Sequence, residues 1–172
     1  MRSSLLRWVA ALVVLQPGLA QAQWSIRLAL EAPMYSHVSV DGQSTSTSVG
    51  DSFQPGIDVL GSYRPVDFLS IDLEVRTGLF STGGYGRTRT TIGPGLTLDV
   101  PTVPLYGRVA FPIQVESGAA LFLRLGGGLK ITDWGFFRIY FEVTLDLGCA
   151  GNGVGFFGSQ TINAALGVWF RL

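Results

Sequence analysis

A histidine flanked by hydroxyl groups is the part of this chain that most resembles a catalytic pattern. His37 is the only histidine, Ser36 and Ser39 lie within two residues of it, and Asp41 and Asp51 follow. A serine nucleophile, a histidine base and an acidic group that orients the base are the parts of a hydrolytic triad. Serine is abundant in this stretch, however, so a histidine without a catalytic role is the alternative interpretation.

Other residues offer weaker chemistry. Metal sites need clustered His, Cys or carboxylate ligands, and the chain has one His and one Cys, Cys149, so we expect no metal and no cofactor. Weak calcium binding by Asp41 and Asp51 is the exception to consider. The glycine-rich residues 151–158 lack the strand-to-helix context of a phosphate loop and predict a flexible loop. Arg87 and Arg89 suit lipopolysaccharide phosphates, or are solvated loop charges.

The first residues predict a secretory signal peptide. Arg2 and Arg7 precede an apolar run, and Pro17 and Gly18 end it. Residues 20–22 match the small-x-small cleavage pattern. We therefore expect cleavage after Ala22. Residues 1–22 are then the signal peptide and residues 23–172 the single mature domain.

Composition excludes several functions. The 12 basic and 12 acidic residues balance, so no charge favours a nucleic-acid partner. After the signal peptide, no run of about eighteen apolar residues predicts a transmembrane helix. Mean hydropathy is nevertheless positive. An exported, apolar chain without membrane helices is typical of an outer-membrane β-barrel.

Strict alternation of apolar and polar residues supports this interpretation. In Leu69–Gly78, apolar residues alternate with Ser70, Asp72, Glu74 and Arg76, which predicts a strand with two different faces. Eight such segments are expected: 24–40, 53–64, 68–80, 90–100, 103–116, 119–132, 136–147 and 161–172. Three short turns, 65–67, 101–102 and 133–135, fall at one end. Residues 41–51, 81–89, 117–118 and 148–160 connect the strands at the other end, as in bacterial outer-membrane barrels.

The charged residues of the segments all share one face. Random placement would do this about once in 256 trials, because a one-residue slip reverses the face. We predict that these sixteen residues form a charge network in the lumen: Arg27, Glu31, Asp58, Arg64, Asp72, Glu74, Arg76, Asp99, Arg108, Glu116, Arg124, Lys130, Arg138, Glu142, Asp146 and Arg171.

The opposite face is almost entirely apolar, which suits lipid. Inward glycines such as Gly128 and Gly167 are expected to leave room for large inward rings, including Tyr106, Tyr140 and Trp169. Five aromatic residues are expected near the short-turn end, where they would form a membrane-interface girdle: Trp24, Tyr63, Trp134, Phe137 and Phe170.

The chain ends with Leu166, Val168, Phe170 and Leu172 at alternate positions. This ending resembles the C-terminal signal of outer-membrane β-barrel proteins, although the last residue is Leu instead of the usual Phe. With eight segments, the mature chain resembles the small eight-stranded outer-membrane barrels of the OmpA and OmpX type. The resemblance implies an all-β, eight-stranded antiparallel up-and-down transmembrane barrel and recognition by the barrel assembly machinery.

The resemblance also implies a location in the outer membrane of a Gram-negative bacterium, with outer-membrane lipids and lipopolysaccharide as partners. We expect a monomeric, non-enzymatic membrane anchor with a closed lumen, which contacts extracellular partners through its outer loops. Three alternatives remain open: a narrow channel, a secreted soluble β-barrel that binds a small ligand, and an enzyme that modifies lipid A. Some barrels of this type modify lipid A with a His, a Ser and an acidic residue, and His37 would serve here.

Overall fold

The computed structural model describes residues 23–40, 43–48, 55–79, 90–100, 102–115, 119–150 and 158–172. Residues 1–22, where we predict the signal peptide, lie outside the described residues. The same holds for Asp41, Asp51, Arg87, Arg89 and Glu116. Within the described part of the chain there is no helix long and apolar enough to cross a membrane.

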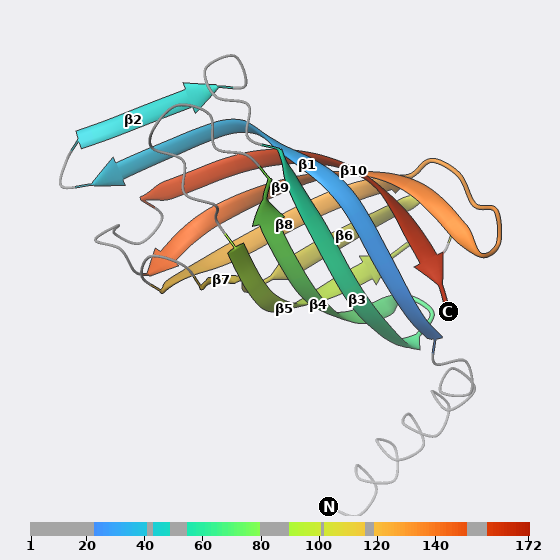
Figure 1. The fold of residues 1–172 in the computed structure, drawn as a ribbon. Coiled ribbons are helices and arrows are strands. Elements are labelled where there is room, and N and C mark those ends of the chain that lie inside the picture. The colour runs from blue at the N-terminus through green and yellow to red at the C-terminus, as the bar shows by residue number, and fades with distance from the viewer. Residues whose placement is uncertain are drawn as a thin grey trace, which may run out of the picture.

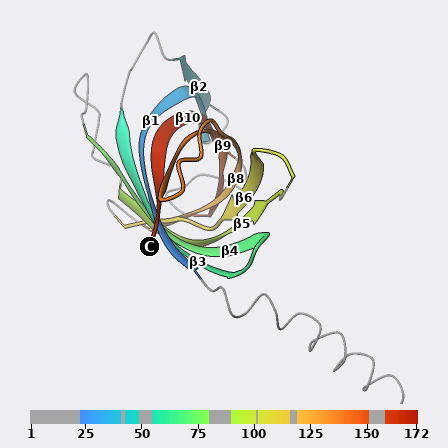
Figure 2. The same ribbon diagram turned by 90° about the vertical axis from the view of Figure 1, so that its right-hand side faces the viewer.

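The described residues form one antiparallel sheet that closes on itself. Its strands are β1 (Gln23–Val40), β2 (Gln43–Ser48), β3 (Gly56–Val66), β4 (Leu69–Gly78), β5 (Thr90–Asp99), β6 (Leu105–Ala110), β7 (Ile113–Gln114), β8 (Ala120–Lys130), β9 (Phe137–Ala150) and β10 (Ser159–Arg171). Around the ring the strands follow their order in the chain, with β1 beside β3 and β10 returning to β1 (Figures 1 and 2).

The closing pair of strands runs from Ser25 opposite Arg171 to Val38 opposite Ser159. β6 and β7 occupy one position in the wall, and β2 continues outward from β1 without joining the ring. The wall therefore has eight strands, and the predicted all-β, eight-stranded antiparallel barrel is confirmed. Both ends of the barrel domain, Gln23 and Leu172, lie at the end that carries the short turns, which we call the short-turn rim (Figure 1).

Three details of the predicted strands were wrong. Residues 41–51 were expected to be a loop, but Gln43–Ser48 pair with Tyr35–Val40 and extend the sheet beyond the ring. Thr45 is β-branched and therefore favours a strand, and the backbone groups of β1 beyond the ring are free to pair with such a strand. We call the paired segments Tyr35–Val40 and Gln43–Ser48 the outer hairpin.

The second difference is a break in the expected segment 103–116. Phe111 and Pro112 separate β6 from β7, because proline has no N–H to donate to the sheet. The Phe111 N–H still donates to the Pro94 carbonyl at 2.9 Å. The third difference is at the outer end, where β9 continues to Ala150 and β10 begins at Ser159, so both ends of the expected loop 148–160 are strand.

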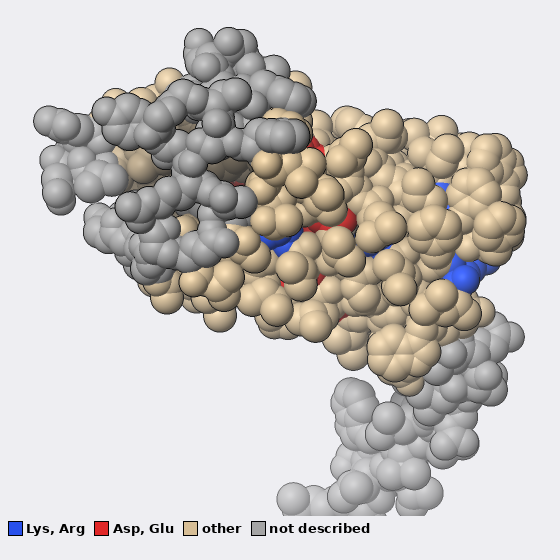
Figure 3. Space-filling model, in the orientation of Figure 1, with Lys and Arg blue, Asp and Glu red and all other residues tan. Residues whose placement is uncertain are grey.

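The two faces of the wall differ as the alternation predicts. On β4, the inward Ser70, Asp72 and Glu74 are at most 2% exposed, whereas the outward Ile71 and Leu73 are 50% and 55% exposed. The pattern repeats around the ring. The exterior seen in Figure 3 is mostly uncharged, with few charged atoms visible. This is the inverse of a soluble protein, whose large apolar side chains are mainly inside.

Aromatic side chains gather on the outside of the short-turn rim. Trp24 packs on Tyr63 with ring centroids 5.0 Å apart, and Phe137 lies 4.8 Å from Trp134 and 6.4 Å from Phe170. These are the five residues expected to form a girdle. Amphipathic rings favour the boundary between hydrocarbon and water, so the rim has the composition of a membrane interface.

Two inward glycines make room for large rings. A Cβ on Gly128 would collide with the ring of Tyr106, and a Cβ on Gly167 would meet both the Leu28 carbonyl and the ring of Tyr140. Glycine is therefore required at both positions by the close approach of neighbouring atoms. In contrast, the outward Gly127 has nothing nearer than 3.9 Å to its Cβ position.

Candidate functional site

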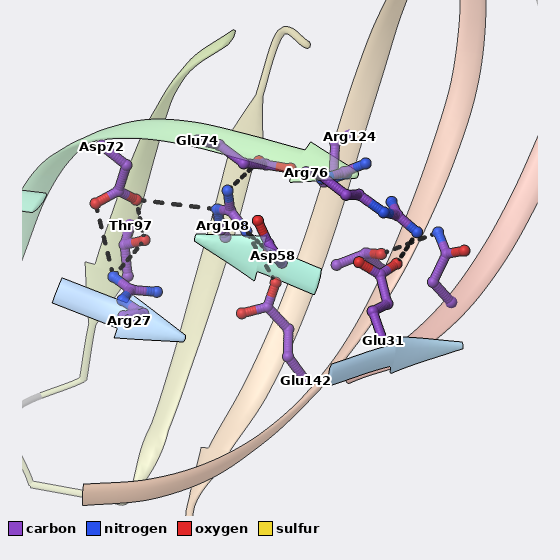
Figure 4. A network of polar contacts seen from close by, with 12 residues as sticks. Arg27, Glu31, Asp58, Asp72, Glu74, Arg76, Thr97, Arg108, Arg124 and Glu142 are labelled. Atoms are coloured by element: carbon purple, nitrogen blue, oxygen red, sulfur yellow. Dashed lines mark hydrogen bonds and ion pairs between the residues drawn. The ribbon is translucent and has the colours of Figure 1, made fainter. Parts of the chain in front are cut away.

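Most of the sixteen residues predicted to face the lumen do face it, and ten of them are joined by a continuous series of ion pairs. We call these ten the central network; they come from β1, β3, β4, β6, β8 and β9, and Figure 4 shows labelled members pointing toward one another. The members are Arg27, Glu31, Asp58, Asp72, Glu74, Arg76, Arg108, Arg124, Glu142 and Asp146.

Arg108 is the hub of the central network. Its guanidinium contacts Glu74 and lies 3.2 Å from Glu142, 3.8 Å from Asp58 and 3.9 Å from Asp72. The side chain is 1% exposed. One arginine thus carries much of the positive charge that four buried carboxylates need, so its loss would leave several anions uncompensated.

Two further arginines extend the network toward the outer end. Arg124 donates two hydrogen bonds to Asp146, at 2.6 and 2.8 Å, and also contacts Glu74. Arg76 donates to Asp146 at 3.1 Å and pairs with Glu31. Two-point contact between a planar guanidinium and a carboxylate fixes the geometry of both groups.

Arg27 links the central network to a layer of aromatic rings. Its Nη2 donates to the Thr97 hydroxyl at 3.0 Å and lies 3.6 Å from Asp72, while Thr97 donates to Asp72 at 2.5 Å. The Arg27 Cζ atom also lies 3.9 Å from the centre of the Trp169 ring, which is a close cation–π contact. The Tyr106 hydroxyl donates to Glu142 at 2.6 Å.

The four remaining basic residues lie near the short-turn rim in two groups, which we call the rim clusters. In the first, Asp99 pairs with Arg64 and, at 2.6 Å, with Lys130. In the second, Asp133 lies 2.6 Å from Arg138 and 3.7 Å from Arg171. Asp133 is 50% and Arg171 34% exposed, so this second cluster is in contact with solvent.

Trp169 lies between the central network and the rim clusters. It is 2% exposed, and besides Arg27 it has Arg64, Lys130 and Arg138 at 5.4, 5.7 and 5.9 Å from its ring centre. Tyr106 packs edge-on against it at 6.1 Å. A large buried ring with four cations around it therefore lies in the lumen next to the short-turn rim.

The central network contains one carboxylate with weaker contacts than the others. Asp58 is 5% exposed, and its Oδ1 accepts no hydrogen bond from the described residues. Its ion pair is the 3.8 Å contact with an Arg108 nitrogen that donates to Glu142 at 3.2 Å. Each of the other five carboxylates has a partner at hydrogen-bonding distance.

The sequence identified which residues face the lumen but missed several of their partners. Tyr106 was predicted to face inward, but its hydrogen bond to Glu142 was not. Thr97 shares the inward face of its strand, so the same alternation could have identified it. Asp133 lies in the turn between β8 and β9, where alternation carries no information. Glu116 lies outside the described residues, and its predicted place in the lumen stays a prediction.

The candidate catalytic histidine lies on the outer hairpin. Its Nδ1 is 2.8 Å from the Ser46 hydroxyl, and the Tyr35 hydroxyl donates to the same Ser46 oxygen at 3.3 Å. The serine beside the imidazole is thus Ser46, across the hairpin, and Ser36 instead bonds to Thr161. Asp41 and Asp51, the acidic residues considered for a triad or for calcium, lie outside the described residues.

The remaining candidates for chemistry are a metal site and the thiol of Cys149. Among the described residues, no group of three or more His, Cys, Asp or Glu side chains could hold a metal ion. Cys149 is a half-buried free thiol near the outer end of β9 whose sulfur lies 3.6 Å from the Leu147 carbonyl oxygen. The lumen therefore offers paired charges and packed rings, and the outer hairpin offers a serine–histidine contact.

No family model and no curated protein matches this sequence. Solved structures do match the fold. Neisserial surface protein A aligns with a TM-score of 0.57 at 10% identity, over 87% of this chain and 97% of that chain. The attachment invasion locus protein Ail of Yersinia pestis, solved in complex with the heparin analogue sucrose octasulfate, aligns at 0.53 and 13% identity, over 88% and 99%. The chain has the fold of these small eight-stranded outer-membrane barrels.

Proposed function

We propose that this chain is an integral outer-membrane protein whose barrel is a closed anchor and whose outer end contacts molecules at the cell surface. The single observation that carries the proposal is the inverted wall, with apolar side chains outward and paired charges inward. A barrel in water would expose this apolar surface at a large free-energy cost, whereas acyl chains remove that cost. Export by the signal peptide 1–22 and insertion by the barrel assembly machinery complete the route.

Contacts within the lumen support the closed state. Eight strands enclose an interior that side chains can fill. The central network and Trp169 occupy successive levels of that interior, and ion pairs and a cation–π contact join side chains from several strands. An ion that entered would have to displace these contacts. We therefore expect no stepwise conductance when the purified protein is added to planar bilayers; regular conductance steps would support the narrow-channel alternative.

The outer hairpin supports the role in surface contact. It extends β1 beyond the ring and holds a regular register from Tyr35 opposite Ser48 to Val40 opposite Gln43. A rigid sheet extension presents side chains without the ordering cost of a flexible loop. Ail was solved with a bound heparin analogue, so a barrel of this fold can bind a ligand. The partner of this chain is proposed to be an extracellular molecule bound at the outer end.

Cell fractionation tests the proposal. The mature chain should be recovered with the outer membrane, require detergent for extraction, and migrate as a folded monomer that shifts on a gel after boiling. Recovery as a soluble monomer in buffer would contradict the proposal. It would also support the alternative of a secreted barrel that binds a small ligand inside.

A second candidate function rests on the 2.8 Å contact between His37 and Ser46. A base next to a hydroxyl is the core of an ester hydrolase, and lipid A esters lie in the same leaflet. Lipid A from cells with the wild-type chain, His37→Ala or Ser46→Ala, examined by mass spectrometry, tests this. Loss of a lipid A species only in the wild type would favour hydrolysis, and identical profiles would end that candidate.

A further inference from the structure

The outer surface of β1 changes character within a few residues. Leu28 and Leu30 are 43% and 63% exposed on the outward, apolar face. Beyond the bulge between Pro33 and Tyr35, the outward residues of β1 are Tyr35, His37 and Ser39. Tyr35 pairs with the outward Ile162 of β10, which is 39% exposed. The apolar wall and the outer hairpin therefore share one continuous outward surface.

The hairpin part of that surface is made of neutral polar groups. The cross-strand pairs Tyr35–Ser48, His37–Ser46 and Ser39–Ser44 place six side chains on one face, which we call the hairpin face. No Asp, Glu, Lys or Arg occurs in Tyr35–Val40 or Gln43–Ser48. Hydroxyl, phenol and imidazole groups donate and accept hydrogen bonds without attracting a strong charge. This composition matches a neutral polyhydroxyl ligand better than a polyanion.

The centre of the hairpin face is preorganised. Ser46 is bonded to His37 at 2.8 Å and to Tyr35 at 3.3 Å, so three side chains from two strands hold one another in place. Positions on a regular hairpin are fixed by the backbone register as well. A ligand that bonds to these groups therefore loses little binding free energy to side-chain ordering.

We propose that the hairpin face binds sugar units of a glycolipid in the outer leaflet of the membrane. The inference rests on the proposed membrane position of the barrel. Because the apolar wall and the hairpin face form one continuous surface, a glycolipid can contact both, whereas a free glycan contacts only the hairpin face. Acyl chains packed on Leu28 and Leu30 place the sugars of the same molecule beside Tyr35 and His37. Tethering by the acyl chains raises the effective concentration of the sugars at the hairpin face, so weak hydrogen bonds suffice.

Binding of purified lipopolysaccharide to the detergent-solubilised mature chain tests the proposal, with bound glycolipid measured by native mass spectrometry. Ser46→Ala should weaken binding about tenfold, as expected when hydrogen bonds at a preorganised site are lost. Thr45→Ala, on the opposite face of the same hairpin, is the matched control and should bind like the wild type. The gel shift after boiling verifies that each variant is folded, and Tyr35→Phe serves as a second test variant.

Two results would overturn the inference. Equal affinity of the wild type, Ser46→Ala and Tyr35→Phe would show that the sugars do not bind the hairpin face. Competition by sucrose octasulfate but not by deacylated core oligosaccharide would show that a polyanion is recognised instead. Either result with the chain still in the outer membrane leaves the proposed anchor function intact, so the two failures are distinguishable.

Discussion

The central network and the rim clusters use the same kinds of side chains in different surroundings. Carboxylates of the central network such as Glu74 are completely buried, whereas Asp133 in a rim cluster is 50% exposed. When a buried ion pair loses one partner, the remaining charge has neither a partner nor water to stabilise it. When an exposed pair loses one partner, water hydrates the remaining charge. Position along the barrel axis, rather than residue type, therefore sets what each ion pair contributes to stability.

The two regions also differ in formal charge. The central network has four arginines and six carboxylates, and the rim clusters have four basic residues and two carboxylates. Together these two described groups hold eight basic and eight acidic residues, so their charges balance, but the charge is polarised along the barrel. Arg27, stacked on Trp169, lies at the junction of the two regions.

The largest expected effect comes from removing an arginine of the central network. Arg76→Ala should lower the free energy of unfolding by on the order of 3 to 5 kcal/mol, because Glu31 and Asp146 lose a buried partner. Urea unfolding of the barrel in lipid vesicles measures this. An unchanged unfolding midpoint and unchanged gel shift after boiling would show that the central network is not needed for stability.

A smaller effect tests how tightly the interior is packed. Gly128→Ala should cost about 1 to 3 kcal/mol because its Cβ would overlap the ring of buried Tyr106. Gly127→Ala, one residue away and outward, should be neutral or stabilising by up to about 1 kcal/mol. The same unfolding assay compares the two variants. Equal effects would contradict the assignment of inside and outside on β8.

Within the central network, Asp58 is expected to contribute less to stability than the other carboxylates. Asp58→Asn should change stability by less than about 1 kcal/mol, because its Oδ1 accepts no hydrogen bond from the described residues, its ion pair with Arg108 is 3.8 Å long, and it lies among an excess of acids. Asp146→Asn is the matched control and should cost clearly more, since it weakens two bonds from Arg124. A large loss of stability for Asp58→Asn but not for Asp146→Asn would contradict this ranking and show that the negative charge of Asp58 is itself stabilising.

The smallest effect is expected at the short-turn rim. Arg171→Ala should cost less than about 1 kcal/mol, because Arg171 is 34% exposed and its 3.7 Å contact with Asp133 is exposed to water. Raising the salt concentration should reduce even this difference. A loss comparable to that of Arg76→Ala would erase the distinction between the two regions.

Alternation in the sequence predicted most of the fold and the orientation of the site. Because successive side chains of a strand point to opposite faces, Asp72 and Glu74 can be assigned to the lumen without knowing their partners. Pairing between strands could not be predicted in this way. Arg108 on β6 reaches past β5 to Glu74 on β4, and that contact depends on how the closed ring staggers its strands.

Local features outside the alternation were also out of reach. Asp133 enters a rim cluster from a turn, and the outer hairpin forms in a stretch whose Ser and Thr composition is typical of a loop. The break at Pro112 follows from the missing N–H of proline, but its place in the wall depends on Pro94 of the neighbouring strand. Predicting these features requires knowing which strand or turn lies next to each residue.

Quenching of single tryptophans by brominated acyl chains tests most directly whether the wall is inverted. In the first variant, Trp24→Phe and Trp134→Phe leave the inward Trp169 as the reporter in the mature chain. In the second variant, Trp169→Phe and Leu73→Trp are added, so that the reporter lies on the outward face. If the wall is inverted, the outward reporter is strongly quenched and Trp169 is not. Strong quenching of Trp169, with no quenching of the reporter at position 73, would contradict it.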